Sequence, residues 1–207
     1  MRLLQRESLL ESLDSLDDNS IFLQPLLERA QVNAVSVDLR LGPDFAVSVL
    51  TRRPSIALAG DESKRGIASY FQETRRDIGN TFVVYPNQLV LAVSLEYVSL
   101  PNHILMDVVT RSSFSRLGIV VSGVIQPGYR GCVPLELYNH GSSPVELIVG
   151  GRVCQGQFFE LENCDEYLDS KSQSPRKYFG AVRPVLSRAD KDEELGRLGR
   201  YPDHFSP

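Results

Sequence analysis

The feature that most constrains the fold is a series of short runs rich in β-branched and aromatic residues, separated by turn residues. In the stretch AVSVDLRLG, which begins at Ala34, apolar and polar residues alternate with the period of a β-strand. Gly42 and Pro43 close this stretch and predict a turn. Repeated short strands of this kind predict an all-β barrel or sandwich. The other strand-like runs are FAVSVL, FVVYP, QLVLAVSLEYV, ILMDVV, CVPLELY, PVELIV and RVCQGQFFEL.

Two segments in the N-terminal half depart from the strand pattern. Leucines recur near helical spacing from Leu3 to Leu13 and predict a short N-terminal helix, which the polar run 14–19 ends. Residues 52–80 are polar and charged, and we expect a long excursion there with a helical turn near 67–71.

The C-terminal part of the chain is charged from Asn163 onward and contains Pro175 and Pro184. We therefore expect a loosely attached segment with at most one short helix. A chain of 207 residues is long enough for one well-buried domain. We predict a single domain over 1–207, in which 164–207 form a C-terminal tail or lid.

Composition narrows the possible partners. A net charge of −4 argues against a general nucleic-acid binder, but 18 Arg against 4 Lys keep a small anionic ligand open. The three cysteines are widely spaced and predict no disulfide framework, and we expect Cys132 and Cys154 to be small buried residues. No signal peptide or long apolar segment is evident, so we expect a cytoplasmic protein that does not bind a membrane.

Most motifs of metal and nucleophilic catalysis are missing from the sequence. The histidines are His103, His140 and His204, and neither His-x-Glu nor Pro-Cys-x-x-Cys occurs, so no zinc site is expected. Ser112 and Ser113 lie outside any Gly-x-Ser-x-Gly elbow, and no P-loop or dinucleotide fingerprint is present. The metal that remains acceptable is Mg²⁺ brought in by a phosphate ligand.

The stretch TRSSFSRLG places two arginines and three serines in one turn, and the strand CVPLELY follows it. Guanidinium and hydroxyl groups suit phosphate contacts, although such a turn is more often a solvated surface turn. Strand alternation places Val133, Leu135 and Leu137 on one face and Glu136 on the other. Taken alone, Glu136 is more often a carboxylate that faces water on a half-exposed strand.

A resemblance to a known family changes this balance. RSSFSRLG, GVIQPGYRGCVPLELYN and GGRVCQGQFFEL resemble the core of the dCTP deaminase family, a branch of the dUTPase superfamily. NAVSVDLRLG and LVLAVSLEYVSLP resemble its first and central strands, and KYFGAVRPVLSR resembles its closing segment. The blocks occur in the family's order along most of the chain, and together they are specific to this superfamily.

The resemblance implies a distorted β-barrel, or jelly roll, of the dUTPase type that assembles as a homotrimer with active sites between subunits. It also implies deamination of dCTP to dUTP and ammonia without a catalytic metal, with Mg²⁺ bound through the triphosphate. One carboxylate can take a proton from the water that attacks cytosine C4, deliver it to N3 and help ammonia leave. Glu136 matches the family's catalytic glutamate in the pattern LEL.

The same match implies the other site residues. Ser112 and Arg116 are implied as catalytic residues beside Glu136, and Lys177 and Tyr178 match the tail that closes over the triphosphate. The residues implied to bind the substrate are Arg111, Ser112, Ser113, Phe114, Ser115, Arg116, Gln126, Pro134, Leu135, Tyr167, Lys177, Tyr178 and Ala181.

Several positions depart from the family's pattern. Gln126 replaces an aspartate that in dUTPases activates the hydrolytic water and contacts the deoxyribose 3′-hydroxyl. An amide can bond a hydroxyl but cannot act as a base, so diphosphohydrolase activity is not expected. Ala181 replaces a ligand-contacting glutamine, and the segment GIVVSGVIQ is shorter than its counterpart. Pro134 removes a backbone donor from the catalytic strand.

Three functions therefore remain in order of preference. A dCTP deaminase leads, because Glu136 and Ser112 are retained. A catalytically weak paralogue that binds a nucleotide as a sensor or regulator comes second, favoured by Gln126 and Ala181. A bifunctional dCTP deaminase and dUTP diphosphatase comes third.

Overall fold

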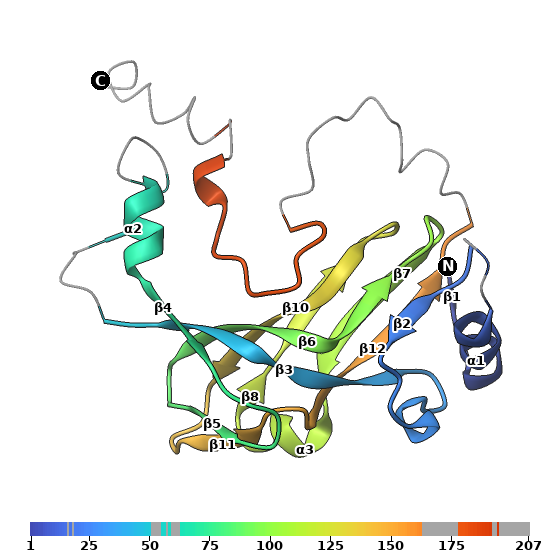
Figure 1. Cartoon of the computed structure of the whole chain (residues 1–207), viewed down its shortest axis with the longest axis horizontal. Helices are drawn as coiled ribbons and strands as arrows, with labels where there is room; N and C mark the ends of the chain where they lie inside the picture. Colours follow the sequence, from blue (N-terminus) through green and yellow to red (C-terminus); the bar gives the residue numbers. More distant parts are fainter. Residues whose placement is uncertain are drawn as a thin grey trace, which may run out of the picture.

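The structure is a computed structural model that describes residues 1–50 except 16 and 18, residues 55, 56 and 58, residues 63–162, residues 178–191 and residue 194. Figure 1 shows a curved β-sheet with a helix at its N-terminal end and a C-terminal segment lying along one side. The elements are β1 (Arg2–Leu3), α1 (Arg6–Asp14), β2 (Phe22–Gln24), η1 (Arg29–Gln31), β3 (Val37–Ser48), α2 (Ser63–Ser69), β4 (Phe71–Arg75), β5 (Thr81–Val84), β6 (Leu89–Ser99), β7 (Ile104–Thr110), α3 (Ser112–Ser115), β8 (Ile119–Val120), β9 (Ser122–Ile125), β10 (Arg130–Asn139), β11 (Val145–Ile148), β12 (Arg152–Glu160) and η2 (Ala189–Lys191).

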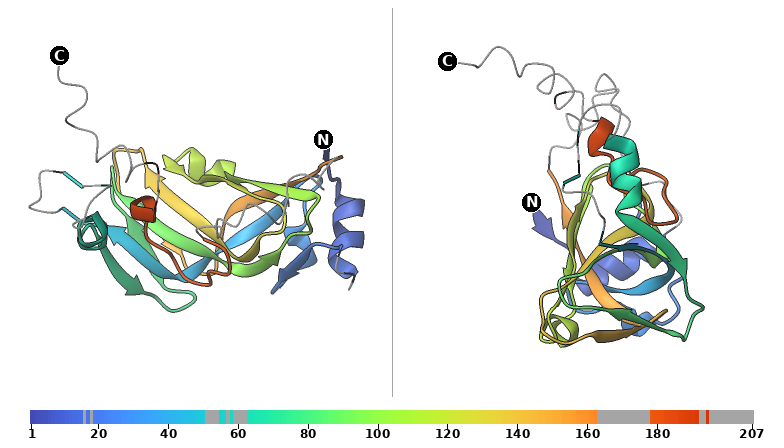
Figure 2. Two further views of the ribbon diagram at one scale, coloured as in Figure 1. Left: turned by 90° about the horizontal axis from the view of Figure 1, so that it is seen from above. Right: turned by 90° about the vertical axis from the view of Figure 1, so that its left-hand side faces the viewer.

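The main sheet has ten strands, whose central order is β8-β10-β6-β3-β12-β7-β9, and all its pairs are antiparallel. β1 adds to β12, β2 to β6 and β4 to β3, while β5 and β11 pair separately. β8 and β9 stand at opposite ends of the order, yet only Val121 separates them in the chain. The sheet therefore curls until its two ends come together and forms a nearly closed barrel (Figure 2). This confirms the all-β barrel expected from the sequence.

The core lies inside the curled sheet. Large side chains such as Leu39, Leu135 and Phe158 are fully buried there and come from β3, β10 and β12. Phe45 and Phe82 stack with ring centroids 3.9 Å apart and join β3 to β5. Burial of this apolar surface is the main term that stabilises the fold.

The turn predicted at Gly42 and Pro43 is wrong, because β3 runs through both residues. The register between β3 and β6 shifts between Leu41 and Phe45, so the pair forms a bulge. A Cβ on Gly42 would lie 2.7 Å from the carbonyl oxygen of Val93. The glycine therefore allows two backbones to approach closely and does not end the strand.

The expectation for 52–80 is confirmed in part. The helical turn expected near 67–71 coincides with the end of α2, which is the helix in the described part of this range and ends at Ser69, but Phe71 begins a strand that pairs with β3. By contrast, α1 confirms the predicted N-terminal helix. None of the described helices is long and apolar enough to cross a membrane.

Candidate functional site

A pocket of about 230 Å³ lies between β10, β6 and the C-terminal segment 178–187. Among the described residues that line it, Glu136 is the only carboxylate. The sequence-implied site residues that it brings together are Pro134, Leu135, Glu136, Tyr178 and Ala181.

Strand alternation places Glu136 in this pocket. Val133, Leu135 and Leu137 are buried in the core, as predicted, and Glu136 is exposed on the opposite face of β10. The same alternation turns the carboxylate away from the apolar core, where an ionised group would be costly to desolvate. Glu136 therefore faces outward, as expected for its position in the strand, and also lines the pocket.

Pro134 lies where the β10–β6 ladder is already interrupted. The register of the two strands shifts between Cys132 and Pro134. The N–H of Val133 donates to the side-chain oxygen of Ser94 at 2.8 Å, and Ser94 is buried in β6. A proline, which has no N–H to donate, is tolerated at such a bulge.

The C-terminal segment closes one side of the pocket by pairing with the outer edge of β10. The N–H of Cys132 donates to the carbonyl of Ala181 at 2.8 Å, and the N–H of Gly180 donates to the carbonyl of Arg130 at 2.7 Å. Gly131 permits this approach, because a Cβ there would lie 2.7 Å from the Ala181 oxygen. The pairing places Ala181 at the pocket.

The pocket residues that were not predicted from the sequence include Tyr129, Cys132 and Arg183. The Tyr129 hydroxyl donates to the Cys132 carbonyl at 2.7 Å. Burial raises the pKa of the Tyr129 hydroxyl and that of the Cys132 thiol. Cys132 is half-buried rather than fully buried as expected, whereas Cys154 is fully buried. The signal for Tyr129 and Arg183 was their position inside the blocks GYRG and KYFGAVRPVLSR.

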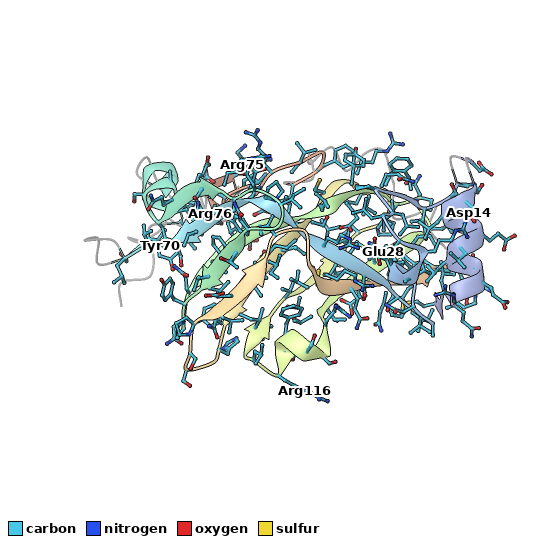
Figure 3. All side chains as sticks on the ribbon, turned by 60° about the horizontal axis from the view of Figure 1, so that its bottom comes forward. Asp14, Glu28, Tyr70, Arg75, Arg76 and Arg116 are labelled. Carbon is cyan, nitrogen blue, oxygen red and sulfur yellow. The ribbon has the colours of Figure 1, made fainter. Side chains whose placement is uncertain are left out.

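The Arg/Ser-rich turn forms α3 directly after β7. The Arg111 carbonyl accepts hydrogen bonds from the N–H groups of Phe114 and Ser115, at 2.9 and 3.0 Å. Phe114 packs against the core, while Ser112 and Arg116 are exposed. Phe114 therefore anchors the turn, and the polar side chains face outward; Figure 3 shows Arg116 extending away from the body of the protein.

The turn and the pocket do not meet within one chain. No residue of 111–116 lines the pocket of Glu136 in the described part of the chain. The segment 178–191 and α3 lie on opposite sides of the molecule (Figures 1 and 2). Gln126 is exposed in the β9–β10 turn and is likewise not among the described pocket residues. Tyr167 and Lys177 lie outside the described residues.

A buried acid lies on β6, the strand that pairs with β10. Glu96 is 0% exposed and accepts hydrogen bonds from the Gln31 side-chain amide at 3.1 Å and the Arg40 N–H at 2.9 Å. Burial raises the pKa of its carboxyl to about 7, against the lowering effect of these hydrogen bonds. Within the described residues, no group of three or more His, Cys, Asp or Glu is arranged to hold a metal ion.

Comparison with known proteins decides the family. The sequence model of a family described as dCTP deaminase-like matches residues 7–161. The chain belongs to the dCTP deaminase-like family. Among curated relatives, it is 35% identical over 183 residues to "dCTP deaminase, dUMP-forming" of Methanobrevibacter smithii, covering 87% of this chain and 93% of that protein. It is 37% identical over 185 residues to "dCTP deaminase" of Natronomonas pharaonis, with the same coverage of 87% and 93%.

A solved structure of the dCTP deaminase family shares the fold. The 2′-deoxycytidine 5′-triphosphate deaminase of Agrobacterium tumefaciens superposes with a TM-score of 0.55 at 22% identity. The match covers 75% of this chain and 47% of that chain, so this chain spans about half of the Agrobacterium chain. At this identity the likeness concerns the fold alone, and it agrees with the dUTPase-type barrel implied by the sequence.

Proposed function

We propose that this protein is a dCTP deaminase, which converts dCTP and water into dUTP and ammonia. The observation that carries the proposal is the position of Glu136, the only carboxylate among the described pocket residues, in a member of the dCTP deaminase-like family. The relatives named as dCTP deaminases, 35–37% identical over most of the chain, support the same activity.

Glu136 acts as the general base in this proposal. It takes a proton from a water molecule as the water oxygen bonds to cytosine C4, and it delivers that proton to N3. The tetrahedral intermediate then collapses to a C4 carbonyl, the C4–N4 bond breaks, and the nitrogen leaves as ammonia after receiving the second proton of the water. Pro134, on the same face of β10 as Glu136, lines the pocket and limits the water that reaches the base.

The phosphates bind at the turn 111–116. The exposed hydroxyls of Ser112 and Ser113 and the guanidinium of Arg116 provide donors for an anion. The substrate is the Mg²⁺ complex of dCTP, in which the ion is bound to the triphosphate oxygens. Tyr178 lies at the pocket from the C-terminal segment, which serves as the lid.

A homotrimer with sites between subunits follows from the separation of these two parts. The pocket of one subunit holds Glu136, and the turn of its neighbour supplies Arg116, so that each trimer has three complete sites. The protein is one domain over 1–207 with the tail 164–207 as lid, and it works in the cytoplasm on free nucleotides, without nucleic acid or membrane.

Subunit complementation tests the shared site. Glu136→Gln and Arg116→Ala subunits are each inactive when prepared alone, but a mixed trimer contains one site with both natural residues. Random mixing into trimers by unfolding and refolding together restores about one quarter of the wild-type rate. A mixture that stays as inactive as its components contradicts the shared site, and refolded wild type is the control.

A bifunctional enzyme is the second candidate, because the Methanobrevibacter relative is named as dUMP-forming. Incubation with dCTP and Mg²⁺ separates the candidates: dUTP indicates a deaminase, dUMP with pyrophosphate indicates the bifunctional enzyme, and binding without product indicates a nucleotide sensor. Gln126 favours dUTP as the product.

A further inference from the structure

A buried carboxylate lies beneath the turn 111–116 and faces two arginines. Asp38 Oδ2 is 3.5 Å from Arg111 Nε and 3.5 Å from Arg152 Nη1. The Asp38 side chain is 4% exposed, whereas those of Arg111 and Arg152 are 35% and 30% exposed. One carboxylate inside the protein therefore holds two guanidinium groups that both reach the surface.

The sheet brings these three residues together from separate strands. β12 pairs with β3 on one side and with β7 on the other, and the Arg111 N–H donates to the Val153 carbonyl at 3.1 Å. Arg111 thus leaves β7 beside the start of β12, where Arg152 lies. Asp38 is fixed in turn, because its Oδ1 accepts the Asn33 side-chain amide at 3.0 Å.

The charges at this cluster do not cancel. Two guanidinium groups share one carboxylate, which leaves an excess of one positive charge at a partly exposed position. Arg111 directs Nε to Asp38 and Nη1 to the Arg152 carbonyl at 3.1 Å, and its Nη2 has no partner among the residues that the structure describes. A carboxylate between two cations reduces their repulsion and holds them at one spacing. Two neighbouring guanidinium groups with donors to spare fit the oxygens of a phosphate chain.

We propose that Arg152 is a further phosphate-binding residue of the turn 111–116, and that Asp38 is a positioning residue that holds Arg111 and Arg152 side by side. The inference rests on the proposed function and deepens it, because the family match implies a role for Arg111 but none for Arg152 or Asp38. The triphosphate of dCTP is the ligand of this pair.

Inorganic tripolyphosphate with Mg²⁺ is the first probe, since it carries the phosphates without the base. Calorimetric titration of the full-length protein is expected to give a Kd at least about 10-fold higher for Arg152→Ala than for wild type. Arg152→Lys keeps the charge but not the planar fork, and it is expected to bind with intermediate affinity. Asp14→Asn is the matched control: it breaks the exposed Asp14–Arg29 pair on α1, far from the turn, and leaves Kd unchanged (Figure 3).

The Asp38→Asn variant distinguishes a role of Asp38 in positioning the two arginines from an effect of its charge alone. This variant makes the cluster more positive, so charge alone would tighten anion binding. A positioning role predicts the reverse, a Kd at least about 10-fold higher, because the two guanidinium groups lose their common partner. The salt dependence of Kd distinguishes the residues further: its slope falls in Arg152→Ala, which loses a cation, and is retained in Asp38→Asn, which keeps both.

Turnover of dCTP gives a second test of Arg152. Arg152→Ala is expected to raise KM for dCTP more than it lowers kcat, because the phosphates lie away from C4. Unchanged tripolyphosphate binding in Arg152→Ala, or no binding by the wild type, overturns the proposal for Arg152. Unchanged or tighter binding in a folded Asp38→Asn overturns the positioning role; where Asp38→Asn does not fold, Asp38→Glu replaces it and is expected to keep the charge while shifting the spacing, again with a raised Kd.

Different results refute the phosphate site at Arg152 and the deaminase activity. A wild type that binds tripolyphosphate through Arg152 but releases no ammonia from dCTP refutes the deaminase and leaves the phosphate site standing. A wild type that deaminates dCTP, with Arg152→Ala equal to it in Kd and KM, refutes the phosphate site and leaves the deaminase standing.

Discussion

At the scale of single residues, Glu136 is both exposed on its strand and part of the candidate site, two interpretations that the sequence presented as alternatives. It is exposed in the way of an ordinary outward-facing strand residue, and it also lines the pocket under the C-terminal segment. The alternation of β10 explains the exposure. The pocket exists because the distant segment 178–187 folds back over that strand, which periodicity cannot predict.

Glu136→Gln is predicted to abolish deamination while leaving the fold and triphosphate binding nearly intact. The amide keeps the size of the side chain but cannot take a proton, a loss that is typically about 10²- to 10⁴-fold in rate. Ammonia release from dCTP is the measurement, and Glu146→Gln, an exposed strand glutamate of β11, is the matched control. Undiminished turnover would show that Glu136 is not the base.

Gln126 is predicted to leave the product at dUTP. An amide cannot activate a water molecule toward the α-phosphate, so the wild type releases no pyrophosphate from dUTP. Gln126→Asp restores an acid–base group and is expected to improve discrimination of deoxyribose from ribose. Pyrophosphate measured with the unmodified protein decides the matter, and release at a rate comparable to deamination contradicts the prediction.

Glu96 is predicted to make stability depend on pH. Its carboxyl has a pKa near 7 in the folded protein against 4.5 for the reference value, so the folded state binds the proton more tightly than the unfolded chain. The resulting stabilisation is complete below pH 4.5 and is lost as the pH rises through about 7. Urea unfolding at several pH values measures this loss, and Glu96→Gln removes it; equal slopes of unfolding free energy against pH in both proteins argue against it.

At the scale of elements, the pairing of the C-terminal segment with β10 depends on two glycines, Gly131 and Gly180. Gly131 has a φ of +145° and faces the Ala181 carbonyl, and Gly180 has a φ of +75°. Both conformations are rarely adopted by residues with a Cβ. The C-terminal segment and β10 are therefore matched to each other through these two glycines.

Gly131→Ala is predicted to displace the lid without unfolding the barrel. The added Cβ would come 2.7 Å from the Ala181 oxygen, so the hydrogen bond from the Cys132 N–H to that oxygen is lost. A higher KM for dCTP and faster proteolysis of the tail are expected, measured against Gly79→Ala. Gly79 also has a positive φ, and a Cβ there meets nothing within 4 Å, which makes it a suitable control. Wild-type KM and proteolysis in Gly131→Ala would mean that the pairing does not hold the lid.

Long strands were predictable from the sequence, and the irregular positions were not. β6, β10 and β12 follow from their apolar periodicity and β-branched content. Gly42 was interpreted as a turn, because a glycine before a proline has the same local signal in a turn and in a bulge. β8 has two residues, too few for any periodicity. Asp38 and Glu96 are buried because they contact residues of other strands, and such contacts cannot be predicted from alternation. Alternation alone placed Asp38 on a polar face, whereas Asp38 is 3% exposed.

The individual site residues were predicted through the family resemblance rather than through the pattern of the strands. Pro134 and Ala181 have no chemical signal of their own, yet both line the pocket. Conversely, Arg152 begins β12 in a block that was matched, but nothing in its local sequence indicates that it faces Asp38 from another strand. Such a contact depends on sheet order, which a linear pattern does not contain.

At the scale of the whole molecule, one chain exposes three apolar side chains shortly after the proposed phosphate turn. Leu117, Val120 and Val124 are 57%, 38% and 54% exposed, and they lie on or next to β8 and β9. Exposed apolar groups close to one half of a divided site are typical of a surface that another subunit covers. These three exposed side chains are consistent with the proposed trimer.

The protein is predicted to have a mass in solution about three times the 23.1 kDa of the chain. Light scattering at micromolar concentration measures it. Val124→Lys places a charge among the exposed apolar side chains after the turn, and it is expected to shift the mass toward that of one chain and to remove activity together with assembly. A stable monomer with full activity contradicts the shared site.

The bond between Ser94 and the N–H of Val133 has an evolutionary consequence. The bulge opposite Pro134 leaves that amide without a strand partner, and the hydroxyl of Ser94 supplies one inside the core. Divergence at position 94 is therefore constrained by the main-chain amide of Val133. Homologues that keep the bulge are expected to retain serine or threonine at position 94, even where their substrate specificity differs.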